Sequence, residues 1–136
     1  MAVSSSGPAA KQFHGHRDLK VAYSLAMQIF RLSKSLPQDE RYSLTSQIRR
    51  SSRSVAANLA EGFRKRQYPN MFVSKLADSD AEATETQVWL DFARDCEYLS
   101  TEQCRELTAR YEEIGMMLHS MMDYPERFLP AMQKVA

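Results

Sequence analysis

Residues 36–62 read LPQDERYSLTSQIRRSSRSVAANLAEG. At about 100° per residue, the period of an α-helix, the side chains from residue 44 onward fall into three sectors of different chemistry. The apolar sector holds Leu44, Ile48, Val55, Leu59 and, just beyond the quoted residues, Phe63. The basic sector holds Arg49, Arg50, Arg53 and Arg64, and the polar sector holds Gln47, Ser54, Asn58 and Glu61. A surface helix needs only one buried and one solvated face, so the third sector predicts a second partner for this helix.

Length and composition indicate one all-α domain. The chain has 136 residues, enough to bury a single core, and it contains only 4 glycines and 5 prolines. No run of about 18 apolar residues is present, so we expect no membrane-spanning helix and no membrane partner. Residues 1–13 lack the apolar core of a signal peptide, and the only cysteines are Cys96 and Cys104. Both features predict a cytoplasmic protein with free thiols.

The first half of the chain predicts two helices. The first covers about residues 18–35, with Asp18 as its N-cap. The second opens at Pro37, because proline is tolerated in the first turn of a helix. It runs past Gly62 to about residue 66, and Tyr68-Pro69 breaks it.

The second half predicts two more helices. Asn70 is the expected N-cap of the third. In the fourth, Ser100 and Gln103 have the spacing of a capping box, and Tyr124-Pro125 ends the helix. Since all connections are short, we predict an antiparallel up-down-up-down four-helix bundle. The expected domain organisation is a disordered leader at 1–15, the bundle at 16–125 and a flexible tail at 126–136.

Charge is distributed unevenly although the formal net charge is only +1. Between residues 41 and 66 every charged side chain except Glu61 is basic, whereas acidic side chains dominate residues 78–113. These segments could neutralise each other within one copy or between copies.

Apolar residues at 114–122, four of them methionines, spread over more than one helix face. They fit either a contact surface or a generously filled core.

No catalytic or metal site is predicted. The chain has no Glu-x-x-His pair of the kind that di-metal bundles use, and its histidines are His14, His16 and His119. Cys96 lies between two acidic residues, which disfavours a reactive thiolate, and no base accompanies either cysteine. We therefore expect no enzyme activity and no cofactor.

Two binding surfaces remain as hypotheses. The polar sector could interlock with a neighbouring helix through hydrogen bonds, or it could simply be solvated. Basic residues could contact successive phosphates of RNA or DNA, and this set comprises Arg49, Arg50, Arg53, Arg64, Lys65 and Arg66. Alternatively, these arginines pair with acidic residues of the third helix, namely Asp78, Glu82 and Glu85.

The pattern also resembles a known family. The matching residues include 17–21, Leu36-Pro37, 40–42, 47–50 and the block Ser54 to Gly62, followed by Phe72, Leu76, Glu82, Glu85-Thr86 and Trp89-Leu90. This pattern resembles the bacterial four-helix-bundle proteins that were first noticed within intervening sequences of 23S ribosomal RNA genes and are also labelled S23 ribosomal proteins. One departure is Ala22, where many members carry tryptophan.

The resemblance implies an antiparallel four-helix bundle that assembles as a ring-like homopentamer without enzymatic activity. A related protein, the accessory variability determinant of diversity-generating retroelements, binds a reverse transcriptase and nucleic acid. We therefore expect a cyclic homopentamer and a non-catalytic scaffold that binds RNA, DNA or a nucleic-acid enzyme such as a reverse transcriptase. The alternative is a module that binds only protein. The expected subunit contact comprises Gln47, Arg50, Ser54, Asn58, Glu61, Glu82 and Glu85.

Overall fold

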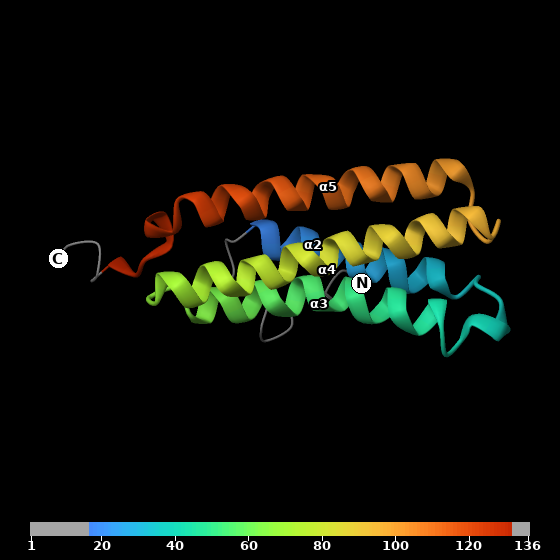
Figure 1. Cartoon of the computed structure of the whole chain (residues 1–136), viewed down its shortest axis with the longest axis horizontal. Coiled ribbons are helices and arrows are strands. Elements are labelled where there is room, and N and C mark those ends of the chain that lie inside the picture. Colours follow the sequence, from blue (N-terminus) through green and yellow to red (C-terminus); the bar gives the residue numbers. More distant parts are fainter. Residues whose placement is uncertain (1–16, 132–136) are drawn as a thin grey trace, which may run out of the picture.

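The computed structural model describes residues 17–131, and within this range all regular elements are helices. Its elements are α2 (Arg17–Ser33), η2 (Gln38–Glu40), α3 (Leu44–Arg64), α4 (Pro69–Asp95), α5 (Thr101–Asp123) and η3 (Pro125–Phe128). The four α-helices lie alongside one another, and successive ones run in opposite directions (Figure 1). The all-α four-helix arrangement predicted from the sequence is therefore confirmed. The predicted leader, 1–15, lies outside the described residues.

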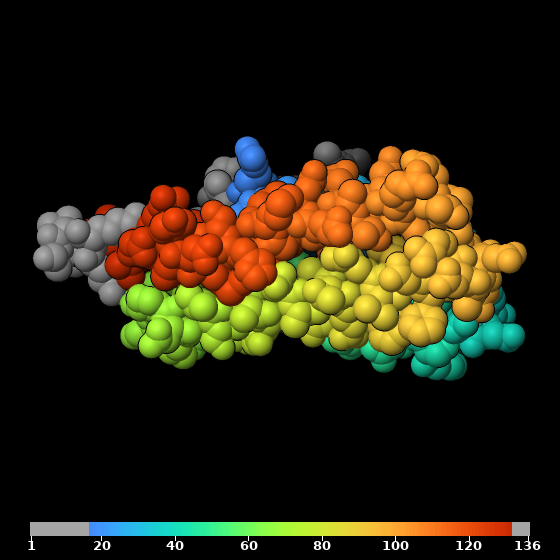
Figure 2. Space-filling model, turned by 45° about the horizontal axis from the view of Figure 1, so that its top comes forward, coloured from blue at the N-terminus to red at the C-terminus, as the bar shows by residue number. Residues whose placement is uncertain are grey.

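The packing order places α3 between α2 and α4, while α5 packs mainly on α4 and only lightly on α2. Figure 2 shows α4 and α5 side by side along their length. The α2–α3 and α4–α5 connections lie at the same end of the bundle (Figure 1). One long side of α3 is consequently left facing outward.

The core is built from the apolar sector of α3 and matching residues of the other helices. All five predicted residues of that sector are buried, namely Leu44, Ile48, Val55, Leu59 and Phe63. Their main partners are Leu25 and Ile29 of α2, Phe72 and Leu76 of α4, and Ile114 and Leu118 of α5. Removal of this apolar surface from water is the main force that holds the helices together.

Small polar residues bring α3 and α4 close together. The Ser79 hydroxyl donates a hydrogen bond to the backbone oxygen of Val55 at 2.7 Å, and Thr86 Oγ1 donates to Ser51 Oγ at 2.8 Å. A Cβ atom on Gly62 would meet the Cβ of Lys75 at 3.3 Å. At these positions the small side chains allow α4 to approach α3 closely.

The helix ends confirm one predicted cap and correct two others. Asp18 is not the N-cap of α2, because that helix already includes Arg17 and Asp18 lies in its first turn. Ser100 Oγ accepts from the backbone N–H of Gln103 at 3.0 Å, and the Gln103 side chain accepts from the Ser100 N–H at 2.9 Å. The predicted capping box is thus present. Asn70 is not the N-cap of α4, because Pro69 is already its first residue and Tyr68 the N-cap. Proline suits that position since its missing N–H would lack an intrahelical partner anyway.

The α2–α3 connection also differs from the prediction. Pro37 opens the short helix η2, and α3 begins only at Leu44. The Glu40 carboxylate accepts from Ser43 Oγ at 2.6 Å, from the Leu44 N–H at 3.3 Å and from the Tyr98 hydroxyl at 2.8 Å. The hydrogen bonds from Ser43, Tyr98 and Leu44 lower the pKa of Glu40, and the bond to Glu40 raises the pKa of Tyr98 to about 12. Glu40 thereby links the turn 41–43 to the α4–α5 connection at the same end of the bundle.

The C-terminal part of the described chain packs on the bundle. The Phe128 ring lies 6.0 Å from that of Phe63 and 5.5 Å from that of Phe72, measured between centroids. Residues 126–128 thus belong to η3, which packs on the bundle through Phe128, and the flexibility expected from residue 126 onward stays a prediction. Residues 132–136 lie outside the described residues, and the rest of the domain division stays a prediction.

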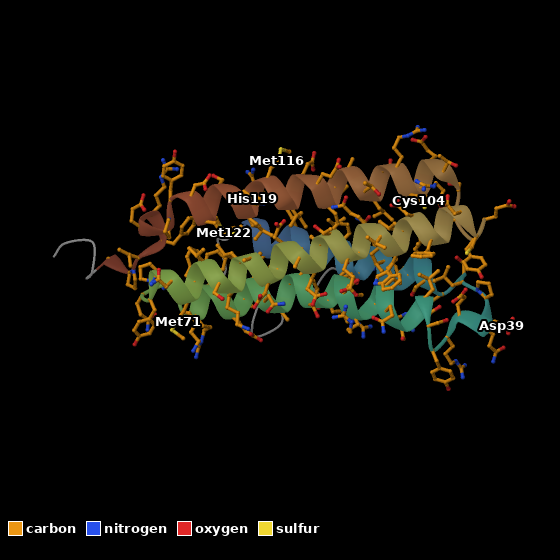
Figure 3. All side chains as sticks on the ribbon, viewed as in Figure 1. Asp39, Met71, Cys104, Met116, His119 and Met122 are labelled. Atoms are coloured by element: carbon orange, nitrogen blue, oxygen red, sulfur yellow. The ribbon has the colours of Figure 1, made fainter. Side chains whose placement is uncertain are left out.

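The methionine-rich part of α5 has members in the core and a member on the surface, and a role of the exposed one in a contact between copies stays a prediction. Met121 is buried and Met122 packs against the core, whereas Met116 is 66% exposed. Met116 projects from the outer side of α5 in Figure 3.

No helix between residues 17 and 131 has the length and apolar character needed to cross a bilayer.

Candidate nucleic-acid interface

The outward side of α3 forms an open groove of about 470 Å³. We call it the arginine groove, and it is lined by Arg41, Ser46, Arg49, Arg50, Arg53, Ser54 and Ala57. The residues contributed by α3 are spaced three or four apart, so they share one face with about 5.4 Å per turn. Arg41 comes from the turn before α3. The groove therefore follows the helix axis and suits an elongated ligand.

Phe30 of α2 supports two of these arginines. The guanidinium carbons of Arg49 and Arg53 lie 4.9 and 5.6 Å from the centre of the Phe30 ring, and Lys34 Nζ lies 4.9 Å from it. Arg49 Nε also donates to Ser33 Oγ at 2.6 Å. An aromatic face attracts cations electrostatically. Phe30 thus gathers three positive charges beside the groove, one of them from Lys34 in the turn that follows α2.

These cations lack acidic partners within the part of the chain that the structure describes. No carboxylate between residues 17 and 131 forms an ion pair with Arg41, Arg49, Arg53 or Lys34. Neighbouring like charges repel each other, and a bound anion would relieve that repulsion. The groove is therefore an electrostatically favourable place for phosphate.

Arg50 is held differently from its neighbours. Its Nη1 donates to Glu82 Oε2 at 3.2 Å, Nη2 pairs with Glu85, and Nε donates to Gln47 Oε1 at 3.2 Å. The hydrogen bonds with Glu82 and Glu85 raise the pKa of Arg50. Burial opposes ionisation of Glu85, but the bonds from Arg50 and Trp89 outweigh it and lower the pKa of that carboxyl. The predicted competition from acidic residues of α4 thus applies to Arg50, and not to Arg49 or Arg53.

The other predicted basic residues lie away from the groove. Arg64 is eleven residues beyond Arg53, which corresponds to about 16 Å along a helix. Lys65 and Arg66 follow α3, and Arg66 Nη1 donates to the backbone oxygen of Phe63 at 3.0 Å. The structure therefore does not bring these three into one site with Arg49 and Arg53.

Sequence reasoning missed three contributors to this surface, namely Arg41, Lys34 and Phe30. The spacing of Phe30 and Lys34 was a usable signal, because residues four apart on a helix are neighbours. Their proximity to Arg49 depends on how α2 packs on α3, and the sequence pattern of α3 alone does not contain that information.

Two residues of the polar sector of α3, Asn58 and Glu61, contact Lys75 on α4 of the same chain, whereas Ser54 lines the arginine groove. Asn58 Nδ2 donates to the backbone oxygen of Ser54 at 2.9 Å, and Asn58 Oδ1 accepts from Lys75 Nζ at 3.4 Å. Lys75 also forms an ion pair with Glu61 at 2.7 Å. These contacts account for a second partner of α3 inside one protomer. A contact between copies through the same residues stays a prediction.

An apolar groove of about 220 Å³ lies where the start of α3 meets the end of α4. It is lined by Glu40, Ser43, Leu44, Gln47, Trp89, Phe92 and Cys96. The Phe92 ring is 53% exposed and lies 5.8 Å from that of Trp89, measured between centroids. Val88, one turn earlier than Phe92 on α4, is also exposed. This surface is suited to contact with another protein.

The remaining chemical groups form no catalytic constellation within residues 17–131. His119 Nε2 lies 3.1 Å from Asp80 Oδ2 on the surface. Cys104 is buried, and desolvation raises the pKa of its thiol, whereas Cys96 is exposed. Figure 3 places Cys104 and His119 at well-separated positions along α5. The described residues contain no group of three side chains that could hold a metal ion.

Comparison with known proteins places this fold in a family. A family model described as 23S rRNA-intervening sequence protein matches residues 17–120. A similar solved structure is the crystal structure of a protein with unknown function from the S23 ribosomal protein family of Bacteroides thetaiotaomicron VPI-5482. It is 29% identical in sequence with a TM-score of 0.71, and the match covers 77% of this chain and 97% of that one.

A comparison with curated proteins finds no match. Neither the family description nor the similar structure names a catalytic activity. The resemblance of the sequence pattern is confirmed, and the match over residues 17–120 means that this chain belongs to the 23S rRNA-intervening sequence protein family.

Proposed function

We propose that this protein is a non-catalytic scaffold that binds the phosphate backbone of nucleic acid through the arginine groove. The observation that carries the proposal is that Arg41, Arg49 and Arg53 line one open groove without an acidic partner among residues 17–131. Guanidinium groups bind phosphate through paired N–H donors. The hydroxyls of Ser46 and Ser54 add further donors on the same surface.

A protein-binding module without nucleic-acid binding is the second candidate. The pairing of Arg50 with Glu82 and Glu85 supports it, because this arginine is already occupied. The three remaining arginines could bind an acidic protein in the same manner. Nucleic acid suits the groove better, because an elongated array of cations matches the regular charge of a phosphate backbone.

The salt dependence of binding tests the proposal. Labelled RNA and DNA oligonucleotides are titrated with the protein at about 50 to 200 mM salt, and log K is plotted against log salt concentration. We expect a linear decrease with a slope of about −2 or steeper, since each phosphate neutralised on a single strand contributes about −0.7. Polyglutamate serves as an acidic control polymer and should bind more weakly than the oligonucleotides. Absence of binding at the lowest salt concentration would refute the proposed function.

We also propose that the protein forms a cyclic homo-oligomer, a pentamer, in which several arginine grooves act together. The exposed apolar groove beside Trp89 and Phe92 supports self-association, because contact with a second copy would remove these apolar side chains from water. A basic α3 and an acidic α4 on one protomer fit a head-to-tail contact, which closes into a ring when the rotation permits. The family resemblance adds a nucleic-acid enzyme, such as a reverse transcriptase, as a proposed further partner.

Light scattering measures this assembly directly. We expect a solution mass near five times the protomer mass of 15.6 kDa. Phe92→Glu places a charge in the apolar groove and should shift the mass towards the monomer. Met71→Glu, a change at a similarly exposed apolar residue near the other end of α4, serves as a control. A stable wild-type monomer would contradict the ring.

A further inference from the structure

Tyr42 is the most exposed of the large apolar side chains between residues 17 and 131, at 85%. It belongs to the turn that precedes α3 and follows Arg41 directly. The guanidinium carbon of Arg41 lies 5.8 Å from the centre of the Tyr42 ring, and Arg41 itself lines the arginine groove. The Tyr42 ring is therefore located at one end of that groove.

The turn that carries Tyr42 is fixed by hydrogen bonds. The backbone N–H groups of Arg41 and Ser43 donate to the oxygens of Gln38 and Glu40 at 3.1 and 3.0 Å. The Glu40 carboxylate accepts from the Ser43 hydroxyl and from the first N–H of α3, and it also accepts from Tyr98 in the neighbouring α4–α5 connection. The exposed ring is thus presented from a braced position, so little conformational entropy is lost when a ligand stacks on it.

Burial in the core does not explain an aromatic ring in this position. The exposed Tyr42 ring contributes almost no hydrophobic stabilisation to the fold, because that stabilisation scales with the apolar area removed from water. A planar ligand that covered the ring would gain this contribution on binding. Every nucleobase has a π-face that can stack on an aromatic side chain, and Arg41 beside the ring adds a cation–π contribution.

We infer that Tyr42 is a stacking platform for an unpaired base, and that the ligand of the arginine groove is single-stranded nucleic acid. This inference rests on the proposed function, since Arg49 and Arg53 would hold the phosphates while Tyr42 receives a base. Bases inside a duplex are stacked on both faces and cannot cover the ring. Bases of a single strand can be turned outward and stack on it.

The test compares single strands with duplex in fluorescence anisotropy. Labelled RNA and DNA strands of about 12 nucleotides, within the usual site size of a single-strand-binding module, are titrated beside blunt duplexes of the same sequence. The wild-type protein should bind the single strands more tightly than the duplexes. Tyr42→Ala should weaken single-strand binding by about 5- to 100-fold, the usual effect of losing one stacked base.

Two control variants separate stacking from other effects. Tyr42→Phe keeps the ring and should bind single strands as the wild type does. Tyr68→Ala removes another exposed tyrosine, at the far end of α3, and should leave binding unchanged. Circular dichroism of each variant checks that the helices are intact. The RNA and DNA arms identify which strand is the better ligand.

The outcomes distinguish this inference from the proposed function. If duplex and single strand bind equally and Tyr42→Ala has no effect, while charge reversal in the groove abolishes binding, the stacking role is refuted and phosphate binding stands. If the wild-type protein binds no oligonucleotide at low salt, the proposed function fails and the stacking role fails with it.

Discussion

Replacement of Phe63 by alanine is expected to lower the free energy of unfolding by about 3–5 kcal/mol. The side chain is 1% exposed, and its ring lies 5.8 Å from that of Phe72 and 6.0 Å from that of Phe128. It therefore connects α3, α4 and η3 at one end of the bundle. Alanine would remove the ring and leave a cavity, because the close-packed helices around it can relax only partially.

Urea unfolding followed by circular dichroism measures this loss. Phe63→Leu retains most of the buried area and should cost less than Phe63→Ala. Phe128→Ala should also cost less, because Phe128 is only partly buried. A decrease below about 1 kcal/mol for Phe63→Ala would mean that the three aromatic rings do not anchor this end of the bundle, since removal of a buried aromatic side chain normally costs several times more.

The helices of this protein could be predicted because their signals are local. The apolar sector of α3 repeats every three to four residues, and all five of its members are buried in the structure. The capping box at Ser100 and Gln103 depends on residues three apart, so its spacing was visible in the sequence. Pro69 at the first position of α4 carried an equally local signal, which the choice of Asn70 as N-cap overlooked.

Contacts between distant residues could not be predicted in this way. Glu40 and Tyr98 are 58 positions apart, and their hydrogen bond ties the start of α3 to the other connection. No periodicity within either segment encodes that pairing. Pro37 was likewise an ambiguous signal, because a proline can precede a short helix such as η2 as well as a longer one.

The spatial arrangement of the basic residues could be predicted only in part, and their role in binding nucleic acid stays a prediction. The helical spacing of Arg49 and Arg53 placed them on one face, and the structure places both in the arginine groove. Which arginines are neutralised depends on how the helices pack, because Arg50 faces the acidic residues of α4 while Arg49 and Arg53 approach Phe30 of α2. The three-dimensional packing of the helices is therefore needed to tell the paired arginine, Arg50, from the two arginines without acidic partners among the described residues.

The double charge reversal Arg49→Glu/Arg53→Glu is expected to weaken nucleic-acid binding by at least about 100-fold. Each arginine lost removes a charge-assisted hydrogen bond worth about 1.5–3 kcal/mol, so two of them account for about 3 kcal/mol or more. The introduced carboxylates also repel phosphate. The slope of log K against log salt concentration should become less steep by about 1.4, because two neutralised phosphates are lost at about 0.7 each.

A matched variant controls for the change in net charge. Arg105→Glu/Arg110→Glu alters the charge by the same amount on α5, which lies diagonally across the bundle from α3. Both side chains are exposed and pair only with neighbours on their own helix. If net charge alone governed binding, this control and the groove variant would lose the same affinity. Arg53→Gln provides a milder change in the groove should the double reversal unfold the protein.

The most direct test of the arginine groove is therefore the affinity of these variants for a labelled single strand, measured by anisotropy at one low salt concentration. The account predicts a large loss for Arg49→Glu/Arg53→Glu, a smaller loss for Arg53→Gln and near wild-type affinity for Arg105→Glu/Arg110→Glu. Equal affinities of the two double variants, with both proteins folded, would contradict the assignment of the groove as the nucleic-acid interface.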